Sequence, residues 1–338
     1  MSIYRQSRSA IRKIVFGDTL IPQEFTIGLI DPQTEITVFL HGMGAPIVVT
    51  RRLTTACCAP LVLGVSLDEG QWAAGSGHCK LSLRFYERAG AKRLLGEIWL
   101  ESRAVIPLDC TELHLFDVLG SINHCLPRPR LWAHFLSQAY SNRRNVGSFD
   151  VKMTARELRA AIVTFIRPHP LMLGSLIGEA GGNMFPMNLM GELGNGYFAF
   201  ALKDSRRAAH LVEDAGRISL SNVPLPLCST AFQMAVNHTK DSISWDQLPF
   251  ALKTSKEFRI PVPAAAPRVR ELQVEQIRKI GSHTLFIARI VSDEKYSDDL
   301  QVHMIHGFFQ HWRMRDRKSE LAASLAADLL NKRGLARS

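Results

Sequence analysis

Short apolar runs, broken at close intervals by glycine and proline, fill most of the chain. Residues 35–67 are rich in Val, Ile, Leu and Thr and contain Gly42, Gly44 and Pro60, a pattern typical of short strands joined by tight turns. Residues 81–107 indicate two further strands around a glycine-containing turn. The first half of the chain is therefore predicted to be rich in β-strand.

Some segments have apolar residues at helical spacing instead. Thr154 and Glu157 form a capping-box pattern at the start of one of them, and Gly216 is positioned to end another. The residues predicted to be helical are 111–125, 130–140, 153–166, 204–216 and, in the tail, 318–335.

The remaining apolar segments of the second half predict strands. Residues 171–202 indicate three of them, with turns at 179–182 and 194–196. Further strands are predicted at 217–226, 283–296 and 301–314. This order lacks the regular strand–helix alternation of a parallel doubly wound sheet. The expected fold class is therefore mainly β, a small antiparallel β-barrel with a few helices.

The length of the chain favours two domains, because 338 residues exceed the usual size of one. The polar stretch 141–152 is the candidate linker, which gives domains 1–150 and 151–338. No apolar run approaches the ~20 residues of a membrane helix, and the N-terminus lacks the apolar core of a secretory signal. A cytoplasmic protein without membrane contact is expected, and its six cysteines are then reduced thiols.

The formal net charge of +10 raises the question of an anionic partner. A nucleic-acid binder is one interpretation, but the basic residues are dispersed and no recognition motif accompanies them. A small anionic ligand, such as the phosphate of a cofactor, needs only a few of these charges, and the others then form a solvated surface. Nucleic acid is therefore the less favoured partner.

Residues 167–224 resemble the core of the flavin-reductase-like FMN-binding split-barrel family, including its flavoredoxin branch. They contain, in order, an Arg-Pro turn, a strand, a glycine-rich turn with Asn, two more strands, a Lys-Asp-Ser segment and a helix. Residues 231–292 resemble the variable insertion of that family and its His-Thr strand. The resemblance extends over about residues 153–314 and rests on the ordered series, because no single motif is diagnostic.

The resemblance implies FMN as the cofactor, bound at a dimer interface, with NAD(P)H as co-substrate. It implies cofactor-binding roles for Asn188, Leu189, Met190, Gly191, Ala201, Leu202, Lys203, Ser205 and Arg206. The first four are expected along the isoalloxazine edge, the next three on the adjacent strand, and the last two at the phosphate. The resemblance also implies a catalytic position for His283, beside the flavin and the nicotinamide. Arg207 and Ala208 depart from the family, which often has Thr in this helix.

The residue types at the expected phosphate end suit an anion. A helix N-terminus with Lys203, Ser205 and Arg206 nearby can bind a phosphate dianion through backbone N–H groups, a hydroxyl and positive charge. The same segment also suits a capped helix with a solvated basic face. Asn188 lies in an apolar strand, where its amide can meet the donors and acceptors of a flavin edge or bond to the backbone in a turn.

The histidines leave alternatives open. His283 begins a segment with strong β-strand character. The alternative to a catalytic role is that it is a structural residue. His303, His306 and His311 invite a metal site, but residues 303 and 306 face opposite sides of a strand. No metal is therefore expected.

An internal comparison relates the two halves. Residues 35–67 align with residues 169–202, since both show strand, glycine-rich turn, strand, turn and apolar strand at nearly equal spacing. We therefore predict two tandem split-barrel-like domains, of which the N-terminal one has diverged and lost the basic phosphate segment. Our hypothesis is that this half acts as a covalent pseudo-partner, replacing the second subunit of single-domain relatives. An unrelated accessory domain is the alternative.

The predicted function is that of an FMN-dependent oxidoreductase of the flavin reductase type, passing hydride from NAD(P)H to FMN and on to free flavin or another acceptor. The protein needs no acid, base or nucleophile of its own for this, because the flavin carries the chemistry. One alternative is a flavin-binding carrier, sensor or complex subunit without reductase turnover. Another is a basic nucleic-acid- or partner-binding module that has lost the flavin. The expected assembly is an intramolecular pseudo-dimer or a homodimer.

Overall fold

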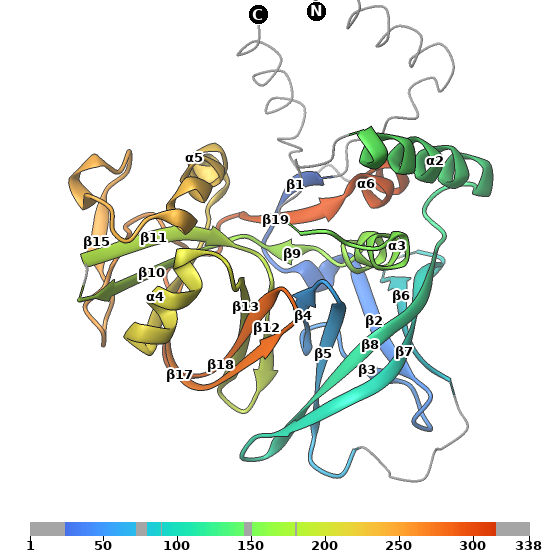
Figure 1. Cartoon of the computed structure of the whole chain (residues 1–338), viewed down its shortest axis with the longest axis horizontal. Helices are drawn as coiled ribbons and strands as arrows, with labels where there is room; N and C mark the ends of the chain where they lie inside the picture. Colours follow the sequence, from blue (N-terminus) through green and yellow to red (C-terminus); the bar gives the residue numbers. More distant parts are fainter. Residues whose placement is uncertain (1–23, 72–79, 89, 145–150, 180, 316–338) are drawn as a thin grey trace, which may run out of the picture.

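Two seven-stranded antiparallel sheets, one in each half of the chain, make up most of the fold (Figure 1). The computed structural model describes residues 24–71, 80–88, 90–144, 151–179 and 181–315. The strands of the N-terminal sheet are β2 (Ile36–His41), β3 (Ile47–Val48), β4 (Leu53–Cys58), β5 (Leu61–Asp68), β6 (Leu81–Glu87), β7 (Leu94–Pro107) and β8 (Thr111–Asn123). The strands of the C-terminal sheet are β10 (Met172–Gly178), β11 (Gly181–Met187), β12 (Met190–Gly194), β13 (Tyr197–Lys203), β14 (Arg217–Asn222), β17 (Arg268–Ile280) and β18 (His283–Lys295).

The two sheets have the same topology. Their strand orders are β3-β2-β6-β7-β8-β5-β4 and β11-β10-β14-β17-β18-β13-β12. When the strands are numbered within each half, these two orders are identical. The mainly β fold expected from the sequence is confirmed, and the segments aligned as a repeat, 35–67 and 169–202, form equivalent strands.

A third sheet joins the two ends of the described chain. β1 (Glu24–Leu29) pairs with β19 (Gln301–His306), and β19 also pairs with β9 (His169–Pro170). β1, near the N-terminal end, thus forms one sheet with β19 and β9, which both follow the linker. The division into domains 1–150 and 151–338 stays a prediction. The two halves share strand pairing, because β1 of the first half pairs with β19 of the second.

Helices cover the outside of the sheets, and one small hairpin projects from the C-terminal half (Figure 1). The α-helices are α2 (Arg128–Arg144), α3 (Ala155–Thr164), α4 (Arg207–Ala215), α5 (Cys228–Gln233) and α6 (Gly307–Arg315). The 3-10 helices are η2 (Pro32–Thr34), η3 (Leu225–Leu227), η4 (Met234–Thr239) and η5 (Trp245–Gln247), and the hairpin pairs β15 (Leu252–Thr254) with β16 (Pro261–Pro263). In the part of the chain that the structure describes, no helix is long and apolar enough to cross a membrane.

Helix α3 begins as its sequence predicts but packs on the other half. Thr154 Oγ1 accepts a hydrogen bond from the Glu157 backbone, and the Glu157 side chain accepts one from the Thr154 backbone at 2.6 Å, so the capping box is present. Its buried face joins the core of the N-terminal sheet. A Cβ atom at Gly96 of β7 would lie 2.7 Å from side-chain atoms of Val163 and Ile166, so a glycine there allows the close approach of this segment.

The two halves meet through reciprocal turns. The backbone N–H of Ser282, in the β17–β18 turn, donates to the carbonyl oxygen of Ala59, in the β4–β5 turn, at 2.9 Å. In the equivalent pair of turns, Asn195 Nδ2 donates to the carbonyl oxygen of Cys110 at 3.4 Å. Each half therefore presents the same two turns to the other, which is the arrangement of a two-fold dimer interface within one chain.

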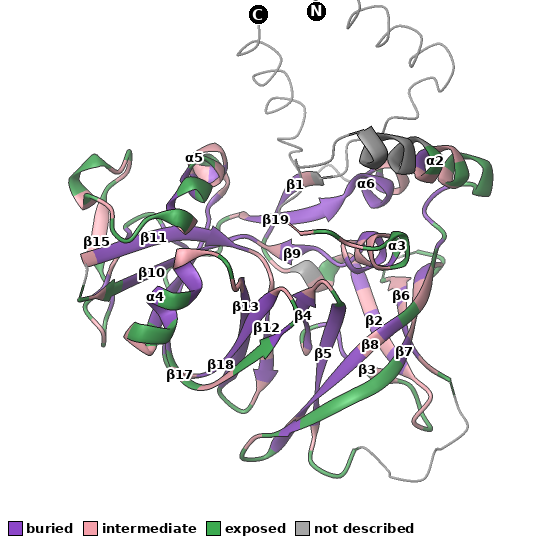
Figure 2. Cartoon of the chain, viewed as in Figure 1, coloured by how far each residue is buried: buried purple, intermediate pink, exposed green. Residues whose placement is uncertain are grey.

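A shared hydrophobic core lies under these turns. It combines buried residues of β4, β5, β7 and β8 with buried residues of β12, β13, β17 and β18, and Figure 2 shows β5 and β13 as mostly buried ribbon. Leu113 and Leu115 of β8 and their topological counterparts Leu285 and Ile287 of β18 all belong to this core. The contact between the halves is thus built like the interior of one domain.

Several sequence expectations are corrected. Residues 111–125 were predicted as a helix, but residues 111–123 form strand β8. The first part of this strand is buried on both faces, because Leu113 packs in the shared core and Phe116 in the N-terminal core. Apolar residues then follow one another too closely for simple alternation and imitate helical spacing. Residues 171–202 form four strands instead of three, and residues 301–314 form strand β19 followed by helix α6. The predicted tail helix, 318–335, lies outside the described residues, as does the part of the linker at 145–150.

Candidate functional site

A pocket opens between the β11–β12 connection, the end of β13 and the start of β18. Its volume is about 300 Å³, and its lining residues are Pro186, Met187, Asn188, Leu189, Ala201, Leu202, Lys203, Arg206, Ala235, His238 and His283. A second hollow of about 520 Å³ continues it and is lined by Lys203, Ser205, Arg206, Arg207, His210 and Thr239. Lys203 and Arg206 line both, so the two hollows form one elongated site, which we call the β13 pocket.

The floor of the β13 pocket is fixed by main-chain pairing. The backbone N–H of Ala201 donates to the carbonyl oxygen of Leu189 at 2.8 Å, which holds the β11–β12 connection along β13. Asn188 is half-buried, and its Nδ2 donates to the sulfur of Met304 in β19 at 3.1 Å. The connection therefore presents one amide and a run of apolar side chains to the pocket.

One wall comes from η4, in the segment that follows β14. Asn183 Nδ2 of β11 donates to the carbonyl oxygens of Asn237 and Lys240, at 3.1 and 2.8 Å, and Asn237 Nδ2 donates back to the carbonyl oxygen of Met184 at 2.9 Å. Both amides are buried, so these bonds are shielded from water and hold η4 against β11. His238 is thereby placed over the pocket, with its Nε2 2.7 Å from the carbonyl oxygen of Pro186.

The far end of the β13 pocket lies at the N-terminus of α4. A capped helix was the alternative interpretation of this segment, but no side chain caps it: the N-cap residue is Arg206, which has an extended backbone and makes no capping hydrogen bond. The helix ends as predicted at Gly216, which is left-handed. An N-terminus without a side-chain cap retains backbone N–H groups and a partial positive charge that favour an anion.

His283 lies opposite Lys203 in the β13–β18 ladder and is 5% exposed. Its Nδ1 is 2.8 Å from Ser282 Oγ. Burial, together with the positive charge of Lys203, lowers the pKa of His283 to about 4. The imidazole is therefore neutral at pH 7 and can take part in hydrogen bonds at this wall without adding charge.

The N-terminal half reaches the same wall through β4 and its turn. Cys57 Sγ lies 3.8 Å from His283 Nδ1 and 3.6 Å from Ser282 Oγ, and Ser282 Oγ also accepts from the backbone N–H of Ala59 at 3.2 Å. Burial raises the pKa of the neighbouring Cys58 thiol to about 12, so that thiol stays protonated. The adjacent cysteines therefore belong to the packed contact between the halves.

Most residues singled out in the sequence come together here. Those that line the first hollow are Asn188, Leu189, Ala201, Leu202, Lys203, Arg206 and His283, and Ser205 lines the continuation. Met190 and Gly191 do not line the β13 pocket. Met190 is buried, and a Cβ atom at Gly191 would lie 2.8 Å from the carbonyl oxygen of Leu53, so this part of β12 packs against β4.

The pocket-lining residues that come from η4, and His210 of α4, were not identified from the sequence. Ala235 and His238 line the first hollow, and Thr239 and His210 line its continuation. Three of them belong to η4, in a stretch without clear periodicity, so no signal in the sequence pointed to them. Among the described residues no group of three or more His, Cys, Asp or Glu side chains is arranged to hold a metal ion.

Comparisons with known proteins give only structural likenesses. No family model and no curated protein sequence matches the chain. Similar solved structures include an FMN-binding protein from Thermus thermophilus with bound p-hydroxybenzaldehyde, at 20% identity over 38% of this chain and 73% of that one, with a TM-score of 0.35. Another is an NADH:FAD oxidoreductase from Streptomyces globisporus, at 12% identity over 45% and 89% of the two chains, with a TM-score of 0.39. A third is the styrene monooxygenase flavin reductase from Pseudomonas putida S12, at 20% identity over 40% and 86%, with a TM-score of 0.33.

Proposed function

We propose that this protein is an FMN-dependent oxidoreductase of the flavin reductase type, which passes hydride from NAD(P)H to FMN and on to free flavin or another acceptor. The observation that carries the proposal is the composition of the β13 pocket. One elongated hollow combines a basic end at a helix N-terminus with an apolar floor that carries one amide and a neutral histidine. FMN has a phosphate at one end, a flexible chain, and a flat ring with a polar edge at the other end. Its phosphate matches the basic end of the hollow, and its ring matches the apolar floor.

The basic end suits the phosphate of the cofactor. Lys203, Ser205 and Arg206 surround the start of α4, where the backbone N–H groups have no side-chain cap. Charge-assisted hydrogen bonds to a phosphate are about twice as strong as neutral ones. Arg207 forms an ion pair with Asp241, so its charge is partly compensated by that partner. Because Lys203, Ser205 and Arg206 line the hollow at the start of α4, we assign the phosphate contacts to them and to the first turn of that helix.

The other end suits the isoalloxazine ring. Leu189, Ala201 and Leu202 offer apolar surface, and the amide of Asn188 offers a donor and an acceptor for the polar edge of the ring. When bound, the flavin itself supplies the hydride chemistry. The protein then has to bind, orient and partly shield the ring, and a neutral His283 can hydrogen-bond at this wall without repelling a cationic nicotinamide.

We further propose one flavin site per chain, with the N-terminal half as the partner surface. The position equivalent to Lys203, at the end of β5, is Asp68, which pairs with Arg52 at 2.6 Å. A carboxylate there repels a phosphate where a lysine attracts one. The reciprocal turns and the Cys57–His283 contact support the idea that the N-terminal half supplies the wall that a second subunit gives in a dimer.

The test is a pair of assays on the full-length protein, FMN binding followed by oxidation of NADH and NADPH with FMN present. The matched variants are Arg206→Gln, which removes a charge from the pocket, and Arg278→Gln, which removes an exposed charge of β17 that does not line it. Loss of a charge-assisted hydrogen bond predicts at least about a tenfold weaker FMN affinity in Arg206→Gln alone. FMN binding without NAD(P)H oxidation would favour a carrier or sensor, and equal effects of the two variants would contradict the assignment of the site.

A further inference from the structure

The outward face of the N-terminal sheet carries a hollow between β2 and β6, which we call the β2–β6 hollow. Its volume is about 480 Å³, and its lining residues are Thr37, Phe39, Tyr86, Glu87, Arg88 and Lys92. None of these residues lines the β13 pocket. The function proposed for the β13 pocket therefore leaves the β2–β6 hollow without a role.

Strand alternation places two aromatic rings in the β2–β6 hollow. Along β2 buried and half-buried residues alternate, so Val38 and Leu40 pack in the N-terminal core while Phe39 faces outward. On β6, Phe85 packs in the same core and its neighbour Tyr86 faces outward. Figure 2 shows the half-buried residues of both strands in pink. The two outward rings are thus fixed by the burial of their neighbours in the chain.

The equivalent face of the C-terminal sheet is covered by its own chain. Between β14 and β17 the C-terminal half contains η3, α5, η4, η5 and the β15–β16 hairpin, whereas the equivalent strands β6 and β7 are joined by the short connection 88–93. On β10, the counterpart of β2, Leu173 shares a buried core with residues of α5 and η4. The short connection provides no such cover, so Phe39 and Tyr86 keep accessible surface.

The two rings form a right-angled corner. Their centroids lie 5.8 Å apart, and their planes meet at 82°. A flat ring that stacks on one of them therefore stands at nearly a right angle to the other. Offset stacking and edge-to-face contact are both favourable between aromatic rings. The corner formed by Phe39 and Tyr86 thus suits an aromatic ring better than an aliphatic chain.

The rim of the β2–β6 hollow is basic. Arg88 and Lys92 are exposed, and neither forms an ion pair within the described part of the chain. Arg88 Nη1 donates to the carbonyl oxygen of Gln33 at 2.6 Å, which anchors the guanidinium at the rim. Glu87 also lines the hollow, so two cations and one carboxylate leave one surplus positive charge. A ligand with a single negative charge balances it.

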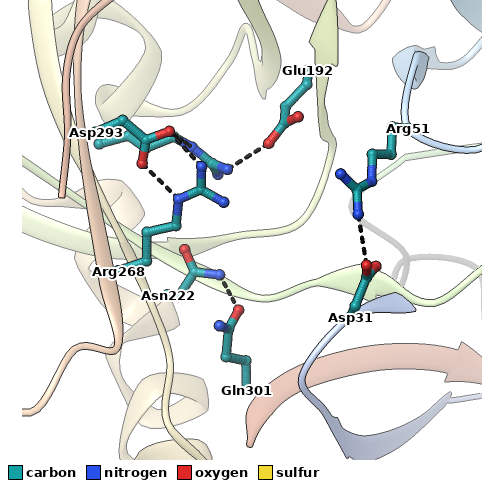
Figure 3. A network of polar contacts seen from close by, with 8 residues as sticks. Asp31, Arg51, Glu192, Asn222, Arg268, Asp293 and Gln301 are labelled. Atoms are coloured by element: carbon teal, nitrogen blue, oxygen red, sulfur yellow. Dashed lines mark hydrogen bonds and ion pairs between the residues drawn. The ribbon is translucent and has the colours of Figure 1, made fainter. Parts of the chain in front are cut away.

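The basic side chains of another cavity are paired within the protein. That cavity lies between the two halves, has a volume of about 360 Å³ and is lined by Arg51 and Arg268, among others. Figure 3 shows that Arg51 binds Asp31 and that Arg268 binds Asp293, each at 2.6 Å. The two cations of the β2–β6 hollow have no such carboxylate partners, so their charges are available to an anionic ligand.

We propose that the β2–β6 hollow binds a small planar aromatic monoanion, such as an aromatic carboxylate. Its ring stacks in the corner formed by Phe39 and Tyr86, and its carboxylate accepts charge-assisted hydrogen bonds from Arg88 and Lys92. The site is separate from the flavin site and does not rest on the function proposed for that site.

Calorimetric titration of the full-length, FMN-treated protein with 2-naphthoate tests the proposal. Neutral 2-naphthalenemethanol is expected to bind at least about tenfold more weakly, because it lacks the charge. Decahydro-2-naphthoate is expected to bind about fivefold more weakly, because it lacks the aromatic rings. Lys92→Gln is expected to reduce the affinity for 2-naphthoate about tenfold and Phe39→Leu about fivefold.

Three control variants separate this site from the β13 pocket and from surface charge in general. Lys256→Gln removes an exposed lysine outside the hollow, Phe258→Leu removes a half-buried ring outside it, and Arg206→Gln removes a charge of the β13 pocket. All three are expected to bind 2-naphthoate like wild type. The Tm of each variant without ligand shows whether it is folded, so lost binding in a folded variant reports on the site itself.

The proposal is overturned by a wild type that does not bind 2-naphthoate, by equal affinity for the neutral or the saturated analogue, or by unchanged binding in Lys92→Gln and Phe39→Leu. Binding that is lost in Arg206→Gln would place the anion in the β13 pocket instead. Sedimentation velocity tests a different occupant. A wild-type dimer that Phe39→Leu converts to a monomer would assign the outward face to a second copy of the chain and would also overturn the proposal.

Discussion

Cys57 of the N-terminal half lies with its Sγ 3.8 Å from Nδ1 of His283, in the wall of the β13 pocket. The contact joins residues 226 positions apart in the chain. It exists because the β4–β5 turn of one half docks on the β17–β18 turn of the other, through the bond from Ser282 N to Ala59 O. The candidate site and the contact between the halves are therefore one structure, and disturbing the contact should disturb the site.

The first prediction concerns that docking. A Cβ atom at Gly281 would lie 2.4 Å from both the carbonyl oxygen of Ala59 and Cδ of Pro60, so Gly281→Ala must move the turns apart. Gly70→Ala is the control, because Gly70 also has a positive φ but nothing lies within 4 Å of its Cβ position. Each substitution costs about 1–2 kcal/mol of backbone strain, and Gly281→Ala adds about 1–3 kcal/mol from the clash. Thermal unfolding should show the larger loss in Gly281→Ala, together with weaker FMN retention. Equal behaviour of the two variants would mean that the turn contact is unimportant.

The second prediction concerns Lys203. Its charge contributes to lowering the pKa of His283 and, in our assignment, to binding the cofactor phosphate. Lys203→Met should therefore weaken FMN binding by about tenfold and raise the pKa of His283 towards its ordinary value. Lys256→Met, at an exposed lysine paired with Glu294, should change neither. Fluorescence titration of FMN and NMR titration of the histidine would measure the two effects, and an unchanged His283 pKa would refute the electrostatic coupling.

The third prediction concerns the pH dependence of turnover. The pKa of His283 is lowered to about 4, so its charge does not change between pH 6 and 8. The kcat/KM for NAD(P)H should therefore be flat with respect to this residue over that range and should fall only in acid, as the imidazole takes up a proton. His283→Gln should abolish that acid limb while leaving FMN affinity within about threefold. An acid limb near pH 6.5 in the wild type, absent from the variant, would contradict the low pKa.

The fourth prediction concerns acid stability. Burial lowers the pKa of His306 to about 3, whereas in the unfolded chain this residue titrates near its ordinary pKa of 6.5. Between these two values the unfolded state binds the extra proton, so the stability present above pH 6.5 is lost as the pH falls. At pH 5 the loss from one such histidine is about 2 kcal/mol. His306→Gln should reduce the slope of unfolding free energy against pH relative to wild type. Urea unfolding at several pH values makes the comparison.

The sequence predicts the candidate site better than it predicts the elements around it. The pattern of β13 and the Lys-Asp-Ser segment is local, so a short series of residues was enough to single out Ala201, Lys203 and Ser205. These residues line the β13 pocket, and their cofactor-binding roles stay predictions. Strand β8 was predicted as a helix, because a strand buried on both faces loses the alternation that identifies strands. His238 was missed because η4 is held over the pocket by the tertiary bonds between Asn183 and Asn237, which no local pattern encodes.

Gly191 shows that a single sequence does not reveal why a glycine is required at a position. The family resemblance implied a position along the flavin edge for Gly191, and that role stays a prediction. In the structure the Cβ position of Gly191 is filled by the main chain of β4. A glycine required for close packing between two halves and a glycine required near a ligand look alike in one sequence. The contact between the halves, which distinguishes the two cases, becomes visible only in three dimensions.

We propose one flavin site per chain, with the N-terminal half as its partner wall. The most direct measurement is the absorbance spectrum of the purified full-length protein after mixing with excess FMN and desalting, with the flavin released and counted against protein. With one site per chain, about one equivalent of FMN is expected to stay bound, less in Arg206→Gln and the same amount in Arg278→Gln. Two equivalents would show that the half with Asp68 also binds flavin, and no retained flavin would contradict the assignment of the β13 pocket as a flavin site.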